Sequence, residues 1–322
     1  MKALKMVEAK WIARCFLFAS IAGSASGLCA AEPMRESFLQ PMGPVADEQF
    51  NHLLRVIGIT MVVILPVLVG VPLILWRYRY SAPLGEYTPR WEFSKKLEWV
   101  LWGVPVLVVV VLASWLWYST QKLDPYEPLG PEPLQVQAIG LDWKWVFIYP
   151  DEGIATVNEL ALPVGRPVEL TLTTDTVMQS LLISSLTGQI YAMPGMTTKL
   201  NFAATRPGVA EGENTQFNGT SFGRQKFTVR AMTPTDYATW TAGGGGGLLL
   251  DEATYTILRR QTVLAEARQD LGLEGTAQPI RMRATEDGIL ERIVAKYHTS
   301  GRRAHGWGGT GRPSDNSVQT AE

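Results

Sequence analysis

Histidine and cysteine are almost absent from this 322-residue chain. Its only histidines are His52, His298 and His305, and its only cysteines are Cys15 and Cys29. No imidazole or thiol falls between residues 53 and 297. Because blue-copper and structural zinc sites are built from these groups, the sequence argues against either kind of site there. The cysteine count also excludes a disulfide framework.

An excess of basic residues is missing as well. Lysine and arginine total 29 against 30 aspartates and glutamates, which gives a formal net charge of -1. A nucleic-acid partner is therefore not expected. Hydrophobic residues make up 46% of the chain, enough for a core domain together with membrane segments.

The N-terminus has the order of segments that is typical of a secretory signal. Four basic residues precede an apolar run over residues 15–22, and small residues follow as far as Ala31. This order predicts a signal peptide over residues 1–31 and an exported mature chain.

Two long apolar runs follow. Residues 56–76 and 97–121 are each long enough to cross a bilayer as a helix. Pro66, Pro72 and Pro105 lie inside them and would be costly in a soluble helix, but membrane bundles tolerate proline. The alternative of a buried core helix is disfavoured by the length of both runs. The sequence thus predicts a hairpin of two transmembrane helices.

The charges between the two runs predict its orientation. Residues 77–96 carry five basic side chains within a short loop: Arg77, Arg79, Arg90, Lys95 and Lys96. Such loops stay in the cytoplasm. Residues 32–55 and everything after residue 121 are then expected in the periplasm. The predicted location is a bacterial inner membrane, crossed twice, with a periplasmic domain.

The exported part divides into a β domain and an arm. A proline-rich connector over residues 124–133 cannot continue the second helix. Alternating segments at 134–139, 167–173 and 226–232 predict an antiparallel sandwich or barrel over residues 122–242.

Five consecutive glycines open the arm, and we interpret them as a flexible tether. The arm spans residues 243–299. Helix-like patterns at 248–272 and 285–297 predict short helices lying on the β domain or on a neighbouring subunit. Residues 300–322 are expected to be disordered.

One stretch of the β domain resembles the copper-site region of subunit II of the haem-copper respiratory oxidases. In that family a His is followed 35 residues later by C-x-E-x-C-x3-H-x2-M. Here the spacing is kept while every ligand is replaced, and the six vacant copper-ligand positions hold Gln179, Asn214, Gln216, Asn218, Phe222 and Gln225. Amides and a phenyl ring cannot replace thiolate, imidazole and thioether donors. No metal is therefore expected in this chain.

Further motifs extend the resemblance over roughly residues 50–240. The segment 142–150 is similar to the aromatic segment of the family, and 153–159 is especially similar to its quinol-oxidase branch. The resemblance implies that the β domain is a cupredoxin-like Greek-key barrel. It also aligns Trp143 with an electron-relay tryptophan, but without copper we interpret Trp143 as a packing residue.

Two further residues gain candidate roles through the resemblance. Glu98 stands in an E-x3-W-x2-P pattern, where the family has a glutamate near the entrance of a proton-uptake channel. A charge that reaches to the membrane surface is the alternative. Cys29 is a candidate lipidation site, but Leu28 precedes it where a small residue is expected, so ordinary cleavage near Ala31 stays open.

The resemblance implies the non-catalytic subunit II of a haem-copper ubiquinol oxidase of the cytochrome bo or ba type. Such a complex oxidises ubiquinol, reduces oxygen to water and pumps protons. Haems and copper are then expected in subunit I, and the partners would be subunit I, further small membrane subunits, ubiquinol and membrane lipid. The alternatives are a copper-free, membrane-tethered periplasmic binding module and a cytochrome c oxidase subunit II.

Overall fold

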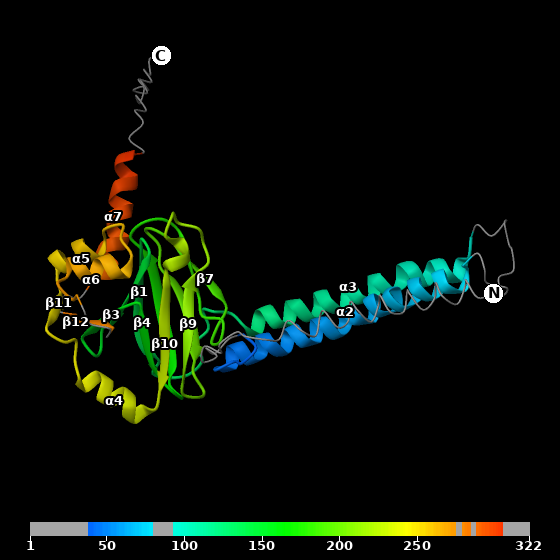
Figure 1. The fold of residues 1–322 in the computed structure, drawn as a ribbon, viewed down its shortest axis with the longest axis horizontal. Helices are drawn as coiled ribbons and strands as arrows, with labels where there is room; N and C mark the ends of the chain where they lie inside the picture. Colours follow the sequence, from blue (N-terminus) through cyan, green and yellow to red (C-terminus); the bar gives the residue numbers. More distant parts are fainter. Residues whose placement is uncertain (1–37, 80–92, 275–278, 285–287, 305–322) are drawn as a thin grey trace, which may run out of the picture. The chain divides into compact units, whose positions relative to one another are not determined.

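The computed structural model describes residues 38–79, 93–274, 279–284 and 288–304 (Figure 1). The predicted signal peptide with Cys29, the middle of the 77–96 loop, and the chain from residue 305 onward lie outside the described residues.

Two long helices, α2 (Pro44–Arg77) and α3 (Lys95–Lys122), form the predicted hairpin. Both are long and apolar enough to cross a membrane, and none of their most apolar stretch is buried. Pro66 and Pro72 lie inside α2, and Pro105 lies inside α3. The hairpin predicted from the two apolar runs is confirmed.

α2 begins at Pro44 rather than near residue 56. Proline suits the first turn of a helix because the N–H that it lacks has no partner there anyway. Charge limits the length of a membrane span but does not end a helix, so α2 extends through Glu48 and Arg55 beyond the apolar run. At this end of the hairpin, Lys122 Nζ of α3 forms an ion pair with the Glu48 carboxylate of α2 at 3.2 Å.

The β domain contains two sheets. The larger has the strand order β11-β12-β3-β2-β1-β5-β8 and the smaller β4-β10-β9-β6-β7. The strands of the larger sheet are β1 (Leu134–Leu141), β2 (Lys144–Tyr149), β3 (Ile154–Val157), β5 (Pro167–Thr174), β8 (Thr198–Ala203), β11 (Leu248–Leu250) and β12 (Ile280–Ala284). Those of the smaller are β4 (Glu159–Pro163), β6 (Gln179–Leu182), β7 (Gln189–Ala192), β9 (Gly208–Asn214) and β10 (Lys226–Met232).

Most neighbouring strands are antiparallel, as the sequence predicts, but three pairs are parallel. These are β1 with β5, β4 with β10, and β11 with β12. β1 and β5 lie side by side in the larger sheet although β4, between them in sequence, belongs to the smaller one. Alternation within a strand cannot reveal this arrangement, because it does not specify which partner the strand pairs with.

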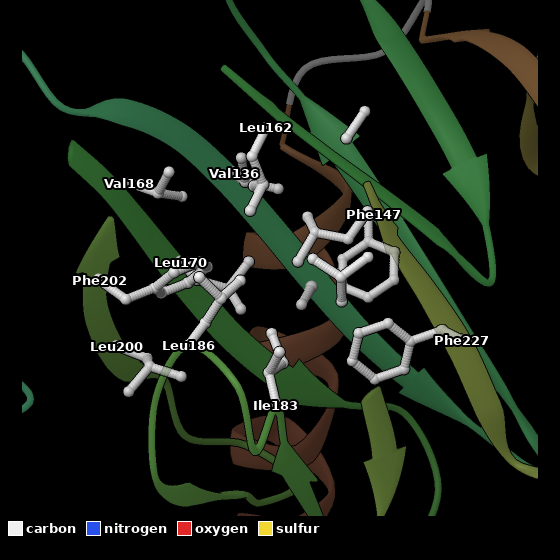
Figure 2. Close-up of a cluster of buried hydrophobic side chains, with 14 of the residues drawn as sticks. Val136, Phe147, Leu162, Val168, Leu170, Ile183, Leu186, Leu200, Phe202 and Phe227 are labelled. Carbon is white, nitrogen blue, oxygen red and sulfur yellow. The ribbon is translucent and has the colours of Figure 1, made fainter. Parts of the chain in front are cut away.

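One apolar core fills the space between the sheets (Figure 2). It includes Phe147 from the larger sheet and Phe227 from the smaller, whose ring centroids lie 5.1 Å apart. Further labelled members are Val136, Leu162, Val168, Leu170, Ile183, Leu186, Leu200 and Phe202.

β2 is buried along its whole length because both faces of the larger sheet are covered there. Trp145, Phe147 and Tyr149 point into the core between the sheets. Val146 and Ile148, which alternate with them, belong to a second apolar cluster with Leu258 of α5 and Ile293 of α7. The arm therefore packs on the β domain, which is one of the two predicted placements.

The glycine run is an ordered turn rather than a free tether. A Cβ at Gly245 would lie 2.1 Å from the backbone carbon of Met282, so only glycine fits this close approach. The run leads into β11, which pairs with β12, and β12 pairs with β3. The arm thus extends the larger sheet, and residues 248–250 form a strand where the sequence predicts helix.

Four helices and one short 3-10 turn complete the described chain. They are η1 (Phe222–Arg224), α4 (Pro234–Ala242), α5 (Glu252–Leu258), α6 (Leu264–Asp270) and α7 (Ile289–Ala304). Asp251 caps α5 by accepting a hydrogen bond from the Thr254 N–H at 2.8 Å. α7 continues to Ala304, so the predicted disordered tail over 300–322 begins with helical residues.

Candidate functional site

Four of the six copper-ligand positions come together at one edge of the smaller sheet. Gln179 starts β6, Asn214 ends β9, and Gln225 immediately precedes β10. These strands are neighbours in the order β10-β9-β6, so their ends meet at the same edge. Asn218 joins them from the loop between β9 and η1. We call these four side chains the amide network.

Gln225 is the centre of the amide network and has no exposed surface. Its Oε1 accepts hydrogen bonds from Asn214 Nδ2 at 3.0 Å and from Asn218 Nδ2 at 2.7 Å. Its Nε2 donates to Gln179 Oε1 at 2.6 Å and to the carbonyl of Leu141 at 3.1 Å. One side chain therefore links β6, β9, the following loop and the end of β1.

The other three side chains of the amide network differ in their further hydrogen bonds. Gln179 Nε2 donates to the carbonyl of Leu141 and to Thr176 Oγ1, each at 3.1 Å. Asn214 Oδ1 accepts from the backbone N–H groups of Ser180 at 2.9 Å and Gln216 at 3.0 Å. Asn218 Oδ1 is buried and has no hydrogen-bond partner among the described residues.

The other two positions lie at the rim of the site. Gln216 takes part through its backbone, where its carbonyl accepts a hydrogen bond from Asn214 Nδ2 at 2.8 Å. Phe222 is half-buried and its ring centroid lies 5.8 Å from that of the exposed Phe217. The spacing of the motif predicts six positions that belong together, and the structure brings the side chains of four into one cluster and leaves those of the other two outside it.

The residues present do not fit a copper centre. The side chains of the amide network offer only carboxamide groups, which already form hydrogen bonds with one another and with the backbone. Copper sites of this type need soft sulfur and imidazole ligands, which these positions do not supply. Within the described ranges, no group of three or more His, Cys, Asp or Glu side chains is placed to hold a metal ion.

Trp143 packs beside the amide network. It sits between β1 and β2 with φ +63°, and its indole N–H donates to the carbonyl of Asn218 at 3.3 Å. A Cβ at Gly219 would lie 3.2 Å from the Trp143 ring, so the glycine allows the loop to approach closely. With an exposed fraction of 8%, the residue packs as a buried aromatic anchor.

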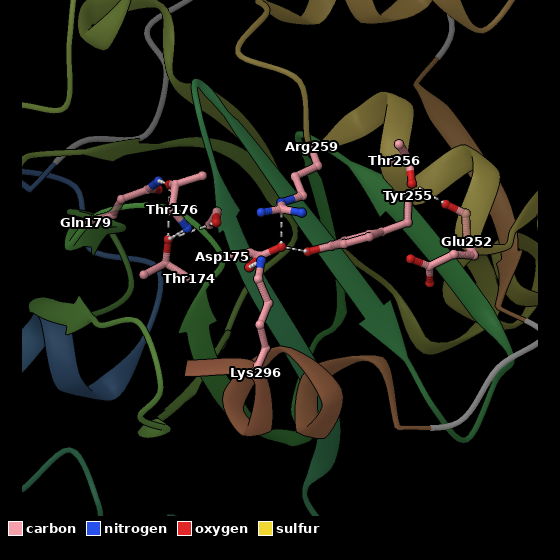
Figure 3. Close-up of polar contacts among 10 residues, drawn as sticks. Thr174, Asp175, Thr176, Gln179, Glu252, Tyr255, Thr256, Arg259 and Lys296 are labelled. Atoms are coloured by element: carbon pink, nitrogen blue, oxygen red, sulfur yellow. Dashed lines mark hydrogen bonds and ion pairs between the residues drawn. The ribbon is translucent and has the colours of Figure 1, made fainter. Parts of the chain in front are cut away.

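A buried carboxylate next to this site holds the arm in place, and sequence reasoning missed it. Asp175 is 3% exposed and lies in the loop between β5 and β6 (Figure 3). Its Oδ2 accepts a hydrogen bond from the Tyr255 hydroxyl at 3.0 Å and pairs with Arg259 Nε at 3.0 Å. Its Oδ1 pairs with Lys296 Nζ at 2.6 Å. We call these four residues the Asp175 cluster.

The Asp175 cluster and the amide network share one loop. Thr174 Oγ1 donates to the carbonyl of Gly140, and Thr176 Oγ1 accepts from Gln179 Nε2. Asp175 lies between the two threonines and points to the arm (Figure 3). Burial, together with the nearby Asp175 carboxylate, raises the pKa of the Tyr297 phenol to about 12. No spacing pattern marks a single aspartate in a loop as a docking point.

Lys144 is a second buried charge that fastens the arm. It opens β2 and is fully buried. Its Nζ donates to the carbonyls of Arg260 at 3.0 Å, Asp142 at 3.1 Å, and Thr262. Burial lowers the pKa of the ammonium from 10.5 to about 8, although the nearby Asp142 carboxylate opposes this shift. The chain thus holds a charged lysine against backbone carbonyls of the arm.

The lowered pKa of Lys144 predicts a rise of stability with pH. Between pH 8 and 10.5 the unfolded chain binds a proton that the folded chain has released, and stability rises with pH wherever the unfolded state binds more protons. The free energy of unfolding of the β domain, relative to that of Lys144→Met, should rise by about 2 kcal/mol from pH 8 to pH 10. Urea unfolding of the detergent-solubilised chain measures this. A difference that stays constant with pH would contradict it.

These features define a membrane-anchored protein with a β-sandwich domain and a cluster of hydrogen-bonded carboxamide side chains at the loop edge of one sheet. No protein-family model matches the chain. Among curated proteins, it is 41% identical over 208 residues to the cytochrome bo(3) ubiquinol oxidase subunit 2 of Pseudomonas putida, covering 64% of this chain and 66% of the relative. It is 36% identical over 266 residues to the ubiquinol oxidase subunit 2 of Acetobacter aceti, covering 81% of this chain and 82% of the relative.

This chain therefore belongs to the ubiquinol oxidase subunit 2 family. It is also 38% identical over 209 residues to the quinol oxidase subunit 2 of Bacillus subtilis, and that alignment spans 65% of the relative. Among solved structures, the chain is similar to the periplasmic domain of subunit II of cytochrome oxidase from Bradyrhizobium japonicum. The match covers 34% of this chain and 91% of the solved chain, with 21% identity and a TM-score of 0.33. The family predicted from the motifs is confirmed by the curated relatives.

Proposed function

We propose that this chain is the non-catalytic subunit II of a terminal ubiquinol oxidase complex in a bacterial inner membrane. The complex oxidises ubiquinol, reduces oxygen to water and pumps protons. Haems and copper belong to the partner subunit I, and no redox step passes through the β domain of this chain. The names of the curated relatives support the assignment to ubiquinol oxidases.

The amide network is the observation that carries this proposal. An external electron donor such as a soluble cytochrome needs a metal relay in subunit II. Here four of the six positions expected for that relay are joined by hydrogen bonds, because Gln225 donates to Gln179 and accepts from Asn214 and Asn218. A lipid-soluble quinol delivers electrons within the membrane and needs no such relay. The change of electron donor therefore explains why the ligands are absent while the sandwich is retained.

The hairpin supplies the surface for assembly. Its apolar stretches in α2 and α3 are unburied within the chain, so they are available to lipid and to other membrane subunits. We propose that one part of this surface anchors subunit I, that further small membrane subunits and lipid contact the rest, and that the β domain covers the periplasmic face of subunit I.

Oxygen uptake by the purified complex tests this proposal. We expect uptake with ubiquinol as electron donor and no uptake above background with reduced cytochrome c. Uptake with cytochrome c alone would reject the assignment and favour the cytochrome c oxidase alternative. Failure of a haem-bearing subunit to co-purify with the chain would favour the free-standing binding module.

Glu98 is the candidate for a direct role in proton uptake. It lies exposed in the first turn of α3, where its backbone N–H donates to the Ser94 carbonyl at 3.0 Å. We expect Glu98→Ala to slow ubiquinol oxidation several-fold without dissociating the complex. Lys96→Ala, which removes a charge at the same helix end, is the control and should leave turnover unchanged. If Glu98→Ala oxidises ubiquinol as fast as the native complex and Lys96→Ala, Glu98 has no role in proton uptake. Its carboxylate is then only a charge that reaches the membrane surface.

A further inference from the structure

A cavity lined by arginines lies at the edge of the β domain where the arm joins it. Its volume is about 800 Å³. Residues from β4, β10, the glycine run, α6 and β12 line the cavity. Its charged lining residues are three arginines and one carboxylate, namely Arg230, Arg268, Arg281 and Glu159. We call it the arginine cavity. It lies apart from the amide network, whose residues do not line it.

Glu159 shows how the guanidinium groups of the arginine cavity are held. Its side chain is 2% exposed, yet neither carboxylate oxygen makes a hydrogen bond among the described residues. Instead Oε1 lies 3.4 Å from Arg230 Nε and Oε2 lies 3.7 Å from Arg281 Nε. A buried carboxylate between two arginines brings their charges together, which would otherwise repel each other.

The two arginines remain accessible on the other side. Arg230 and Arg281 side chains are 46% and 30% exposed, and both line the cavity. The Arg281 guanidinium also lies 4.8 Å from the centre of the Trp240 ring, which supports its position. Guanidinium groups present paired N–H donors that match the oxygens of phosphates and carboxylates.

The glycine run forms another part of the cavity wall. Gly243, Gly244, Gly246 and Gly247 line the cavity, so no side chain of the run fills it. Gly244 and Gly246 have φ +60° and +67°, a backbone conformation that side chains other than glycine rarely adopt. A ligand in the cavity can therefore approach this backbone closely while it contacts the arginines.

We propose that the arginine cavity binds a phosphate group. Arg230 and Arg281 share the single carboxylate of Glu159, so this part of the lining keeps an excess of positive charge. Arginine pairs are a common device for binding phosphate oxygens. The phosphate could belong to a free inorganic ion or to the headgroup of a phospholipid. Both sources share the same chemistry, and two probes distinguish them. The site is independent of the electron donor of the complex.

A pair of glycine variants provides the sharpest test. A Cβ at Gly247 meets no heavy atom within 4 Å, so Gly247→Asp places a carboxylate at the cavity wall without disturbing existing contacts. Gly223 is equally open and exposed, but lies in η1 outside the cavity, so Gly223→Asp adds the same charge elsewhere. The double variant Arg230→Gln/Arg281→Gln removes two of the cations.

Isothermal titration calorimetry of the full chain, in a detergent without phosphate and at matched ionic strength, measures binding of each probe. The probes are inorganic phosphate and glycerophosphoglycerol, the soluble headgroup of phosphatidylglycerol. We expect Gly247→Asp and the double arginine variant each to weaken binding at least tenfold, and Gly223→Asp to change it less than twofold. Tighter binding of one probe identifies the source. No binding of either probe, or equal affinity in Gly247→Asp and Gly223→Asp, would overturn the proposal.

Discussion

Replacing Gln225 with methionine should lower the free energy of unfolding of the β domain by about 3 kcal/mol. Methionine has a similar volume but cannot make the hydrogen bonds of the amide. The substitution leaves Gln179 Oε1 and Asn218 Nδ2 buried without the partner that each has in the native chain. Each orphaned buried polar group costs about 1–3 kcal/mol. The midpoint of thermal unfolding of the detergent-solubilised chain should therefore fall by roughly 6–12 °C.

Gln216→Met is the matched control for this prediction. Gln216 occupies another of the six copper-ligand positions, but it is half-buried and joins the amide network through its backbone. Its substitution should change the free energy of unfolding by less than about 0.5 kcal/mol. Equal effects of the two variants would show that the amide network does not hold this edge of the sheet.

Replacing Asp175 with asparagine should release the arm from the β domain. The carboxylate is 3% exposed and receives the Tyr255 hydroxyl, Arg259 and Lys296 at once. An asparagine amide has one acceptor oxygen where the carboxylate has two, and its NH₂ group would face a donor. Hydrogen bonds to charged groups contribute about 1.5–3 kcal/mol each, so we expect a loss of about 3 kcal/mol.

Limited proteolysis measures the release of the arm directly. When the arm opens and closes faster than trypsin cuts, the cleavage rate follows the fraction of molecules with an open arm. A loss of about 3 kcal/mol in the free energy of opening raises that fraction roughly 100-fold. Tryptic cleavage after Arg259 or Arg260 should accelerate by the same factor. Asp270→Asn is the control, because Asp270 pairs with Arg260 at 3.3 Å on the exposed surface and such pairs contribute little. An unchanged cleavage rate in Asp175→Asn would show that apolar packing alone holds the arm.

The elements that the sequence predicts well are those with strong local patterns. The two apolar runs become α2 and α3, and the alternating segment 226–232 is β10 at the same bounds. The motif spacing predicts that six positions belong together, and the structure brings four of them, Gln179, Asn214, Asn218 and Gln225, into one hydrogen-bonded cluster. In each case the signal lies within a short stretch or in a fixed spacing.

What the sequence does not predict depends on long-range contacts. β11 has three residues, too few for a period to be seen, and it forms a strand because β12 lies beside it. The glycine run is fixed by the backbone of Met282, which is distant in sequence. Lys144 and Asp175 carry no local signal, since their partners in the arm lie eighty or more residues later in the sequence. These contacts make the arm part of the β domain.

The central claim is that four of the six copper-ligand positions of this subunit form a structural amide network in place of a copper centre. Copper analysis of the purified full chain, after equilibration with copper and removal of the excess, tests it most directly, together with the near-infrared absorption of the same sample. The account predicts copper well below one ion per chain and no near-infrared band. Stoichiometric copper accompanied by that band would contradict it.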